Sequence, residues 1–241
     1  MNPVSAQHIF YGHLLHPQHA LPLIKPVTDQ IWPSVFLIVC LAILALVKVS
    51  AWPKVTKIVQ SSFSAQAMHL LEREEINPFK FYHLALNLLF ILDLSFLCYK
   101  TNSIYTLILT QQSHFVQFCF FVLLVSLVFT FKMLLTNLLG FFTNERKVVS
   151  EYRVNSILIN ETFGLILFPL IVLAQFSSFD PLGFVFGGVL VVAASLLLKW
   201  YRGVIIGLVE ERIGLLQTFS YFCGLEILPV LVLVKYVIET F

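Results

Sequence analysis

Six long apolar stretches constrain the fold of this chain more than any other feature of its sequence. Each has the roughly 20 residues that a helix needs to cross the hydrocarbon core of a bilayer. They occupy residues 31–49, 81–99, 115–139, 156–176, 182–200 and 220–238. Charged residues make up 12% of the chain, whereas soluble domains carry about 25%. The sequence therefore predicts an all-α polytopic membrane protein of about six transmembrane helices.

Lysine and arginine fall unevenly on the two sides of these predicted spans. Lys25, Lys100 and Lys235 lie in the N-terminal tail, in the second connection and near the C-terminus, and the rest of the fifteen lie on the opposite side. Short cytoplasmic loops collect basic residues, so both termini are predicted to be extracytoplasmic, in a multi-pass protein of the bacterial inner membrane. The basic side predicts contact with anionic lipid headgroups. The charge pattern gives no reason to expect a nucleic-acid partner.

The stretches outside the spans suggest how the chain is divided. Residues 1–30, which contain four prolines, are predicted to form an extracytoplasmic tail, and residues 31–241 a helical transmembrane domain. Residues 54–71 and 203–219 are predicted as amphipathic segments on the cytoplasmic side. The first would rest among the headgroups or pack under the bundle. The second would either extend the fifth span or lie in the membrane plane.

Three acidic side chains, Asp93, Glu161 and Glu226, lie inside the predicted spans. A charge at that depth costs roughly 2.5 to 3.5 kcal/mol on insertion scales, so such groups usually face a partner, a cavity or a functional path. Asn87, Glu161 and Glu226 each lie roughly 9 Å inside the cytoplasmic end of their span, at 1.5 Å per residue. Asp93 lies nearer the midplane. Together with Asn160, these residues form a candidate polar intramembrane layer.

Three arginines, Arg153, Arg202 and Arg212, form a candidate cytoplasmic rim around this layer. Two interpretations of the layer remain open. Its side chains either bond one another and the rim to fix helix packing, or they line a cavity that holds a polar headgroup or exchanges protons. His83, in the second span, is expected to extend toward the interface rather than to act as a base.

The second, fourth and sixth spans begin in a similar way. Each follows a basic segment, opens with an aromatic residue and then carries polar groups, which suggests three related helical hairpins. In the fifth span, Gly183 and Gly187 form a small-xxx-small step. Such steps permit close packing between helices, and they need no function beyond packing.

Four histidines in the tail, His8, His13, His16 and His19, are weak candidate metal ligands. Neutral imidazole is the commonest metal ligand, but Pro17 interrupts the helical spacing that would align them, and no carboxylate or cysteine completes a recognised pattern. We therefore predict no metal and no cofactor. Intramembrane hydrolysis would need a nucleophile with a base, paired aspartates or a metal cluster. The sequence has none of these complete motifs, and an enzyme is the least favoured class.

Four segments carry a resemblance to a known family. They read INPFKFYHLALNLLF at 76–90, YRVNSILINETFGLILFPL at 152–170, WYRGV at 200–204 and CGLEILPVLVLVK at 223–235. Here the chain resembles membrane proteins of Bacteroidota genomes that are grouped as the domain of unknown function numbered 4271. The resemblance covers most of residues 75–241. It implies an integral inner-membrane protein of a Gram-negative lineage, and it brings no activity, substrate or cofactor.

The sequence favours two classes of function. The chain has small loops, and its 24 phenylalanines suit contact with lipid or with other helices. It is therefore predicted to be an accessory or scaffold subunit that binds other membrane-protein subunits. The alternative is a transporter or lipid-handling protein that uses the polar intramembrane layer.

Overall fold

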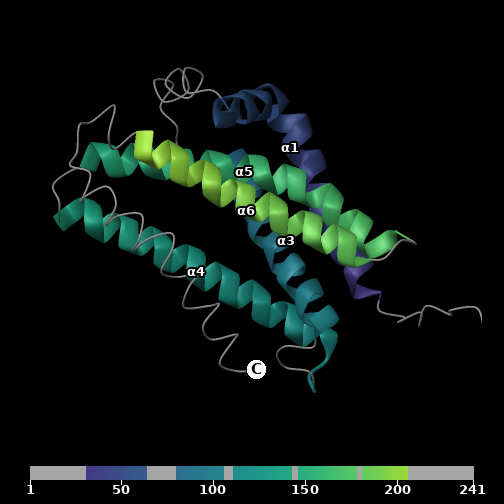
Figure 1. The fold of residues 1–241 in the computed structure, drawn as a ribbon. Coiled ribbons are helices and arrows are strands. Elements are labelled where there is room, and N and C mark those ends of the chain that lie inside the picture. Colours follow the sequence, from purple (N-terminus) through teal and green to yellow (C-terminus); the bar gives the residue numbers. More distant parts are fainter. Residues whose placement is uncertain (1–30, 64–79, 106–110, 143–145, 178–180, 206–241) are drawn as a thin grey trace, which may run out of the picture. The chain divides into compact units, whose positions relative to one another are not determined.

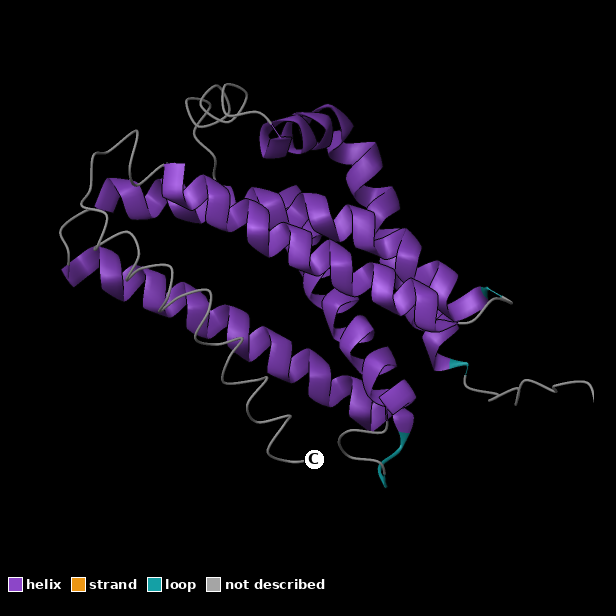
Figure 2. Cartoon of the chain, viewed as in Figure 1, coloured by secondary structure: helices purple, strands orange, loops and turns teal. Residues whose placement is uncertain are grey.

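The computed structural model describes residues 31–63, 80–105, 111–142, 146–177 and 181–205. These residues form helices and short connections, with no strand among them (Figures 1 and 2). The helices are α1 (Trp32–Phe63), α3 (Phe81–Tyr105), α4 (His114–Phe142), α5 (Arg146–Phe176) and α6 (Pro181–Ile205).

All five helices are long and apolar enough to cross a membrane. The prediction of an all-α protein whose helices are long and apolar enough to cross a membrane is confirmed for the described part of the chain. The tail at 1–30, residues 64–71 and 206–219 of the two amphipathic segments, and the sixth predicted span at 220–238 lie outside the described residues.

The first predicted span and the amphipathic segment after it form one kinked helix. The backbone of α1 leaves helical geometry at Ala51, with φ −148° and ψ 22°, and Pro53 follows two residues later. Proline lacks the amide hydrogen that the helix needs, and its ring clashes with the carbonyl four residues earlier. Beyond the bend, Val55 and Ile58 are buried in one cluster with residues of α3 and α5. The described part of the amphipathic segment therefore packs against the bundle.

Helix α5 is the most enclosed of the described helices. Within its apolar span 67% of the residues are buried, whereas the value is 17% for α4 and for α6. It packs against α1, α3, α4 and α6, and Figure 1 shows it running beside α6. Its buried side chains include several polar ones, namely Asn155, Ser156, Asn160, Glu161 and Thr162.

An aromatic cluster joins α1, α3 and α4 where α1 begins. The Trp32 ring lies 5.2 Å from the rings of Tyr99 and of Phe118, and Phe36 stacks on Phe96 at 5.1 Å. Aromatic pairs at these spacings are worth about 0.5–1.5 kcal/mol beyond their buried area. The cluster fixes the beginning of α4 against α3 and leaves its other end to pack on α5.

Two glycines allow the helices of the core to approach closely. A Cβ atom at Gly164 of α5 would lie 3.0 Å from Cβ and 3.2 Å from Cα of Phe90 on α3, and one at Gly188 of α6 would lie 2.7 Å from Leu97. At Gly183 a Cβ would meet nothing within 4 Å, and at Gly187 it would meet only Leu170 at 3.9 Å. Within the described residues, the small-xxx-small step at Gly183 and Gly187 is therefore not a point of close approach between helices.

Candidate functional site

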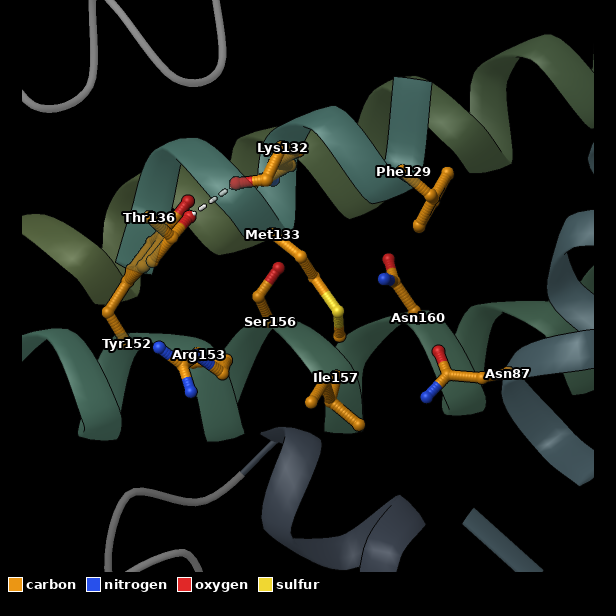
Figure 3. Close-up of a pocket in the computed structure, with 10 residues that line it drawn as sticks. All are labelled: Asn87, Phe129, Lys132, Met133, Thr136, Tyr152, Arg153, Ser156, Ile157 and Asn160. Atoms are coloured by element: carbon orange, nitrogen blue, oxygen red, sulfur yellow. Dashed lines mark hydrogen bonds between the residues drawn. The ribbon is translucent and has the colours of Figure 1, made fainter. Parts of the chain in front are cut away.

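Two neighbouring cavities lie between α4 and α5. The inner cavity has a volume of about 40 Å³ and also touches α3 (Figure 3). The outer cavity, about 350 Å³, lies near the end of α4 and the beginning of α5. The inner one is lined by Asn87, Phe129, Lys132, Met133, Thr136, Tyr152, Arg153, Ser156, Ile157 and Asn160, and the outer one by Asn137, Gly140, Phe141, Val149, Ser150 and Arg153.

Arg153 is the residue that the two cavities share. One of its terminal nitrogens, Nη2, donates a hydrogen bond to Oδ1 of Asn137 on α4. Its Nε is buried and has no hydrogen-bond partner within the described residues. Asn160, on the inner wall, likewise buries Oδ1 without a partner there. Buried polar atoms normally find a partner, so the walls of the cavities have unused capacity for hydrogen bonds.

The charged side chains that line the two cavities, Lys132 and Arg153, are both cations. Lys132 of α4 places Nζ 6.0 Å above the ring of Tyr152 on α5, which is within cation–π range. Thr136 and Ser156 add hydroxyl groups, and Figure 3 shows them on facing helices. None of the described residues lining either cavity is acidic. The arrangement therefore suits an anion with several acceptor oxygens.

A buried pair joins α3 to α5 near these cavities. Nδ1 of His83 lies 2.9 Å from both Oε1 and Oε2 of Glu161, and the two side chains are 2% and 0% exposed. The pair is satisfied if Nδ1–H donates to a carboxylate, or if a protonated carboxyl donates to Nδ1. The expectation that His83 extends to the interface is wrong, because Glu161 gives the imidazole a polar partner inside the core.

Two hydroxyl groups extend this polar contact to the second half of α1. Oγ of Ser62 lies 2.7 Å from Oγ1 of Thr162, and it also donates to the carbonyl oxygen of Leu158 at 3.1 Å. Both hydroxyl-bearing side chains are buried. Residues 158, 161 and 162 of α5 therefore hold both α1 and α3.

Replacing Thr162 by valine should loosen α1 from α5 with little change in shape. We expect a loss of about 1 kcal/mol of unfolding free energy, because the hydroxyl of Ser62 loses one partner in a buried site. Equilibrium unfolding in mixed detergent micelles measures this loss. Thr130→Val is the matched control, because Thr130 is exposed and, among the described residues, its hydroxyl bonds only to the carbonyl of Ser126 in its own helix. Equal losses in the two variants would contradict the proposed role of Thr162.

The predicted rim and layer residues do not form a single ring. Arg202 of α6 is buried and donates from Nη1 to Oδ1 of Asn155 at 3.1 Å, so it ties α6 to α5 and is not among the residues lining the two cavities. Asp93 of α3 is 0% exposed, and neither of its carboxylate oxygens has a hydrogen-bond partner among the described residues.

Of the predicted residues, the structure brings Asn87, Asn160 and Arg153 together at the inner cavity. Glu161 instead contacts His83, whose role as a buried partner was not predicted from the sequence. One signal was available for it, since His83 precedes Asn87 by one helical turn and so lies on the same face of its helix, about 6 Å nearer the cytoplasmic end. The remaining candidates, Glu226, Arg212, His8, His13, His16 and His19, lie outside the described residues. The described part of the chain contains no cluster of three or more metal-ligating side chains.

Comparison with known proteins gives one match. The model of a family described as "Domain of unknown function (DUF4271)" matches residues 34–237. No curated protein and no solved structure matches the chain. The matched region contains α3–α6 entire and nearly all of α1, and with them every residue that lines the two cavities.

Proposed function

The chain belongs to the family of the domain of unknown function DUF4271, and we propose that it is a lipid-handling membrane protein that binds an anionic phospholipid headgroup between α4 and α5. The observation that carries this proposal is Arg153, whose guanidinium lines both cavities and keeps a buried Nε without a partner in the described part of the chain. The planar guanidinium matches phosphate geometry better than any other side chain.

The two cavities differ in what they would hold. The outer one, at about 350 Å³, falls in the size range of ligand sites, roughly 300–1,000 Å³. It would receive the phosphate, with Asn137 and Ser150 beside Arg153. The inner one has room for water only, at about 40 Å³. It would hold water between the headgroup and the amides of Asn87 and Asn160.

A lipid is favoured over a soluble anion by the position of the site. The outer cavity lies at the end of two apolar helices, which is the level of lipid headgroups when such helices span a bilayer. The exposed apolar residues Leu134, Leu138 and Phe141 of α4 lie along the same end of the helix. They would contact acyl chains while Arg153 contacts the phosphate.

Replacing Arg153 by glutamine should weaken the binding of anionic phospholipid roughly 10- to 100-fold. A hydrogen bond to a charged group is worth about 1.5–3 kcal/mol, and each 1.4 kcal/mol is a factor of about ten in affinity. The measurement is lipid binding by native mass spectrometry, with the purified protein titrated with phosphatidylglycerol or with phosphatidylcholine.

Lys48→Gln is the matched control, because Lys48 is an exposed cation on α1 that lines neither cavity. Arg153→Lys should give an intermediate affinity, since it keeps the positive charge but loses the planar guanidinium, which can donate two parallel hydrogen bonds to one phosphate. Equal affinity for the charged and the zwitterionic lipid in the wild-type protein would overturn the proposal. Competition by inorganic phosphate alone, without any lipid preference, would identify a soluble anion as the ligand.

The remaining features of the topology are part of the same proposal. We place six spans in three hairpins in a bacterial inner membrane, with both termini extracytoplasmic, as the distribution of basic residues favours. The resemblance to Bacteroidota proteins supports a Gram-negative origin. In this orientation the outer cavity faces the cytoplasmic leaflet, where anionic lipids attract basic side chains.

An accessory role in a membrane complex is the second candidate function. It is favoured by the low burial of α4 and α6, at 17% of each span, although lipid covers such faces equally well. Gentle extraction that recovers a membrane protein in fixed stoichiometry, together with unchanged lipid binding in Arg153→Gln, would favour this candidate over lipid handling.

A further inference from the structure

Asp93 stands apart from the site between α4 and α5. It lies twelve residues from either end of α3 (Phe81–Tyr105), which is about 18 Å along the helix at 1.5 Å per residue. In a helix that crosses a hydrocarbon core of about 30 Å, this position is close to the midplane. Its side chain is 0% exposed. A carboxyl group is therefore held at the level of the membrane where an ion is least stable.

The groups around Asp93 do not offset the free-energy cost of burying its carboxyl group in the charged form. Neither oxygen has a hydrogen-bond partner in the described residues. On the same helix, Leu89 and Leu97, one turn away on either side, are buried in an apolar cluster. The titratable group that α1 brings near it is the buried thiol of Cys40.

The charged groups on the other helices packed against α3 are engaged elsewhere. On α5, Glu161 contacts His83 and Arg153 lies at the cavities. On α4, Lys132 lies over Tyr152. On α6, Lys199 lies over the ring of Phe90 and Arg202 bonds Asn155, and both make further interactions. None of these groups forms an ion pair with Asp93 within the described part of the chain.

We propose that Asp93 is a proton-binding site at the middle of the membrane, distinct from the lipid site. A carboxylate without donors or a cation is costly in an apolar medium, whereas the neutral acid is tolerated far better. The ligand of the site is therefore a proton, which binds to one carboxylate oxygen and leaves from it. A carboxyl group kept for packing alone would gain nothing over an amide of the same shape. Reversible protonation is the property that distinguishes the two.

The test is modification with dicyclohexylcarbodiimide, which partitions into the membrane and reacts with protonated carboxyl groups. The acid proton moves to a carbodiimide nitrogen while the carboxylate oxygen bonds to the central carbon. The O-acylisourea then rearranges to a stable N-acylurea that retains every atom of both reactants. The whole protein is treated in native membranes, and peptide mass spectrometry locates the adduct. We expect it on Asp93, with slower formation as the pH is raised.

Three variants make the result decisive. Asp93→Asn should lose the adduct at this peptide, and Asp93→Glu should retain one, because it preserves an acid group in the same place. Glu161→Gln should leave the Asp93 adduct unchanged. The proposal is overturned if folded wild-type protein gives no adduct on Asp93, or if the adduct forms at one rate at every pH. A water-soluble carbodiimide that labels Asp93 as fast as the membrane-soluble one would also overturn it, since the residue would then be open to water.

Discussion

His83→Ala is expected to lower the unfolding free energy by about 3 kcal/mol, at the lower end of the 3–5 kcal/mol seen when one member of a buried pair is removed. The reason is that Glu161, which is 0% exposed, has no hydrogen-bond or ion-pair partner other than His83 among the described side chains. A hydrogen bond between neutral groups on two membrane helices would be worth only about 0.6 kcal/mol. The size of the loss therefore reports how strongly Glu161 depends on His83. Equilibrium unfolding in mixed detergent micelles measures it.

A double-mutant cycle separates this pair from its surroundings. Glu161→Gln removes the acid and keeps an amide that can bond the imidazole, so it should cost less than His83→Ala. In the Glu161→Gln background, His83→Ala should lose far less than it does in the wild type. His114→Ala is the control histidine, because within the described part of the chain His114 bonds only the hydroxyl of Tyr99, at 3.3 Å. Identical losses for His83→Ala in both backgrounds would show that the two side chains are not coupled.

Gly164→Leu should abolish most of the folded protein. A Cβ atom there would lie 3.2 Å from the Cα of Phe90, and a backbone atom cannot rotate aside as a flexible side chain can. Overpacking costs typically 1–3 kcal/mol, and we expect at least the upper end here, because α3 and α5 must separate along their contact. The His83–Glu161 pair joins the same two helices and would be pulled apart with them. Folded yield after extraction, measured by size-exclusion chromatography, shows the effect.

Gly183→Leu provides the same change of side chain in α6 without the contact. A Cβ atom at Gly183 meets nothing within 4 Å, so the added side chain would point into open space. Leucine also favours the helix over glycine by up to about 1 kcal/mol. The yield of this variant should equal or exceed that of the wild type. Normal yield for Gly164→Leu would mean that α3 and α5 do not meet at Phe90.

The sequence predicted the elements of the fold better than their contacts. The predicted span at 31–49 lies within α1 except for Ile31, and the spans beginning at residues 81, 115, 156 and 182 lie within α3, α4, α5 and α6, because a bilayer sets a minimum apolar length that can be read along the chain. The glycine contacts could not be read in this way. Gly183 and Gly187 have the spacing of a packing motif, yet the close approaches occur at Gly164 and Gly188. Spacing identifies a face of a helix, and only the neighbouring helix determines whether that face is used.

The same difference between elements and contacts applies to the candidate site. Composition singled out Asn87, Asn160 and Arg153 as polar groups in or beside apolar spans, and they line the inner cavity. Whether Arg153 holds a lipid there stays a prediction. The pairing of Glu161 with His83 was not predicted, because His83 lies 78 residues earlier in the chain. Its position one helical turn before Asn87 places it on the same helix face, but this position alone does not show whether the imidazole points into the core or toward the interface.

The sequence by itself determined that this protein is helical and fit to cross a membrane, because apolar length and the scarcity of charge are properties of single segments. It also identified Asp93 and Glu161 as acids in apolar surroundings. The tertiary structure alone decided that the two differ. The crossing of α3 and α5 gives Glu161 a partner in His83, while Asp93 lies where the described helices present no hydrogen-bonding group to it. The cost of burying an acid depends on the groups within a few ångströms of it, and these come from residues far apart in the chain.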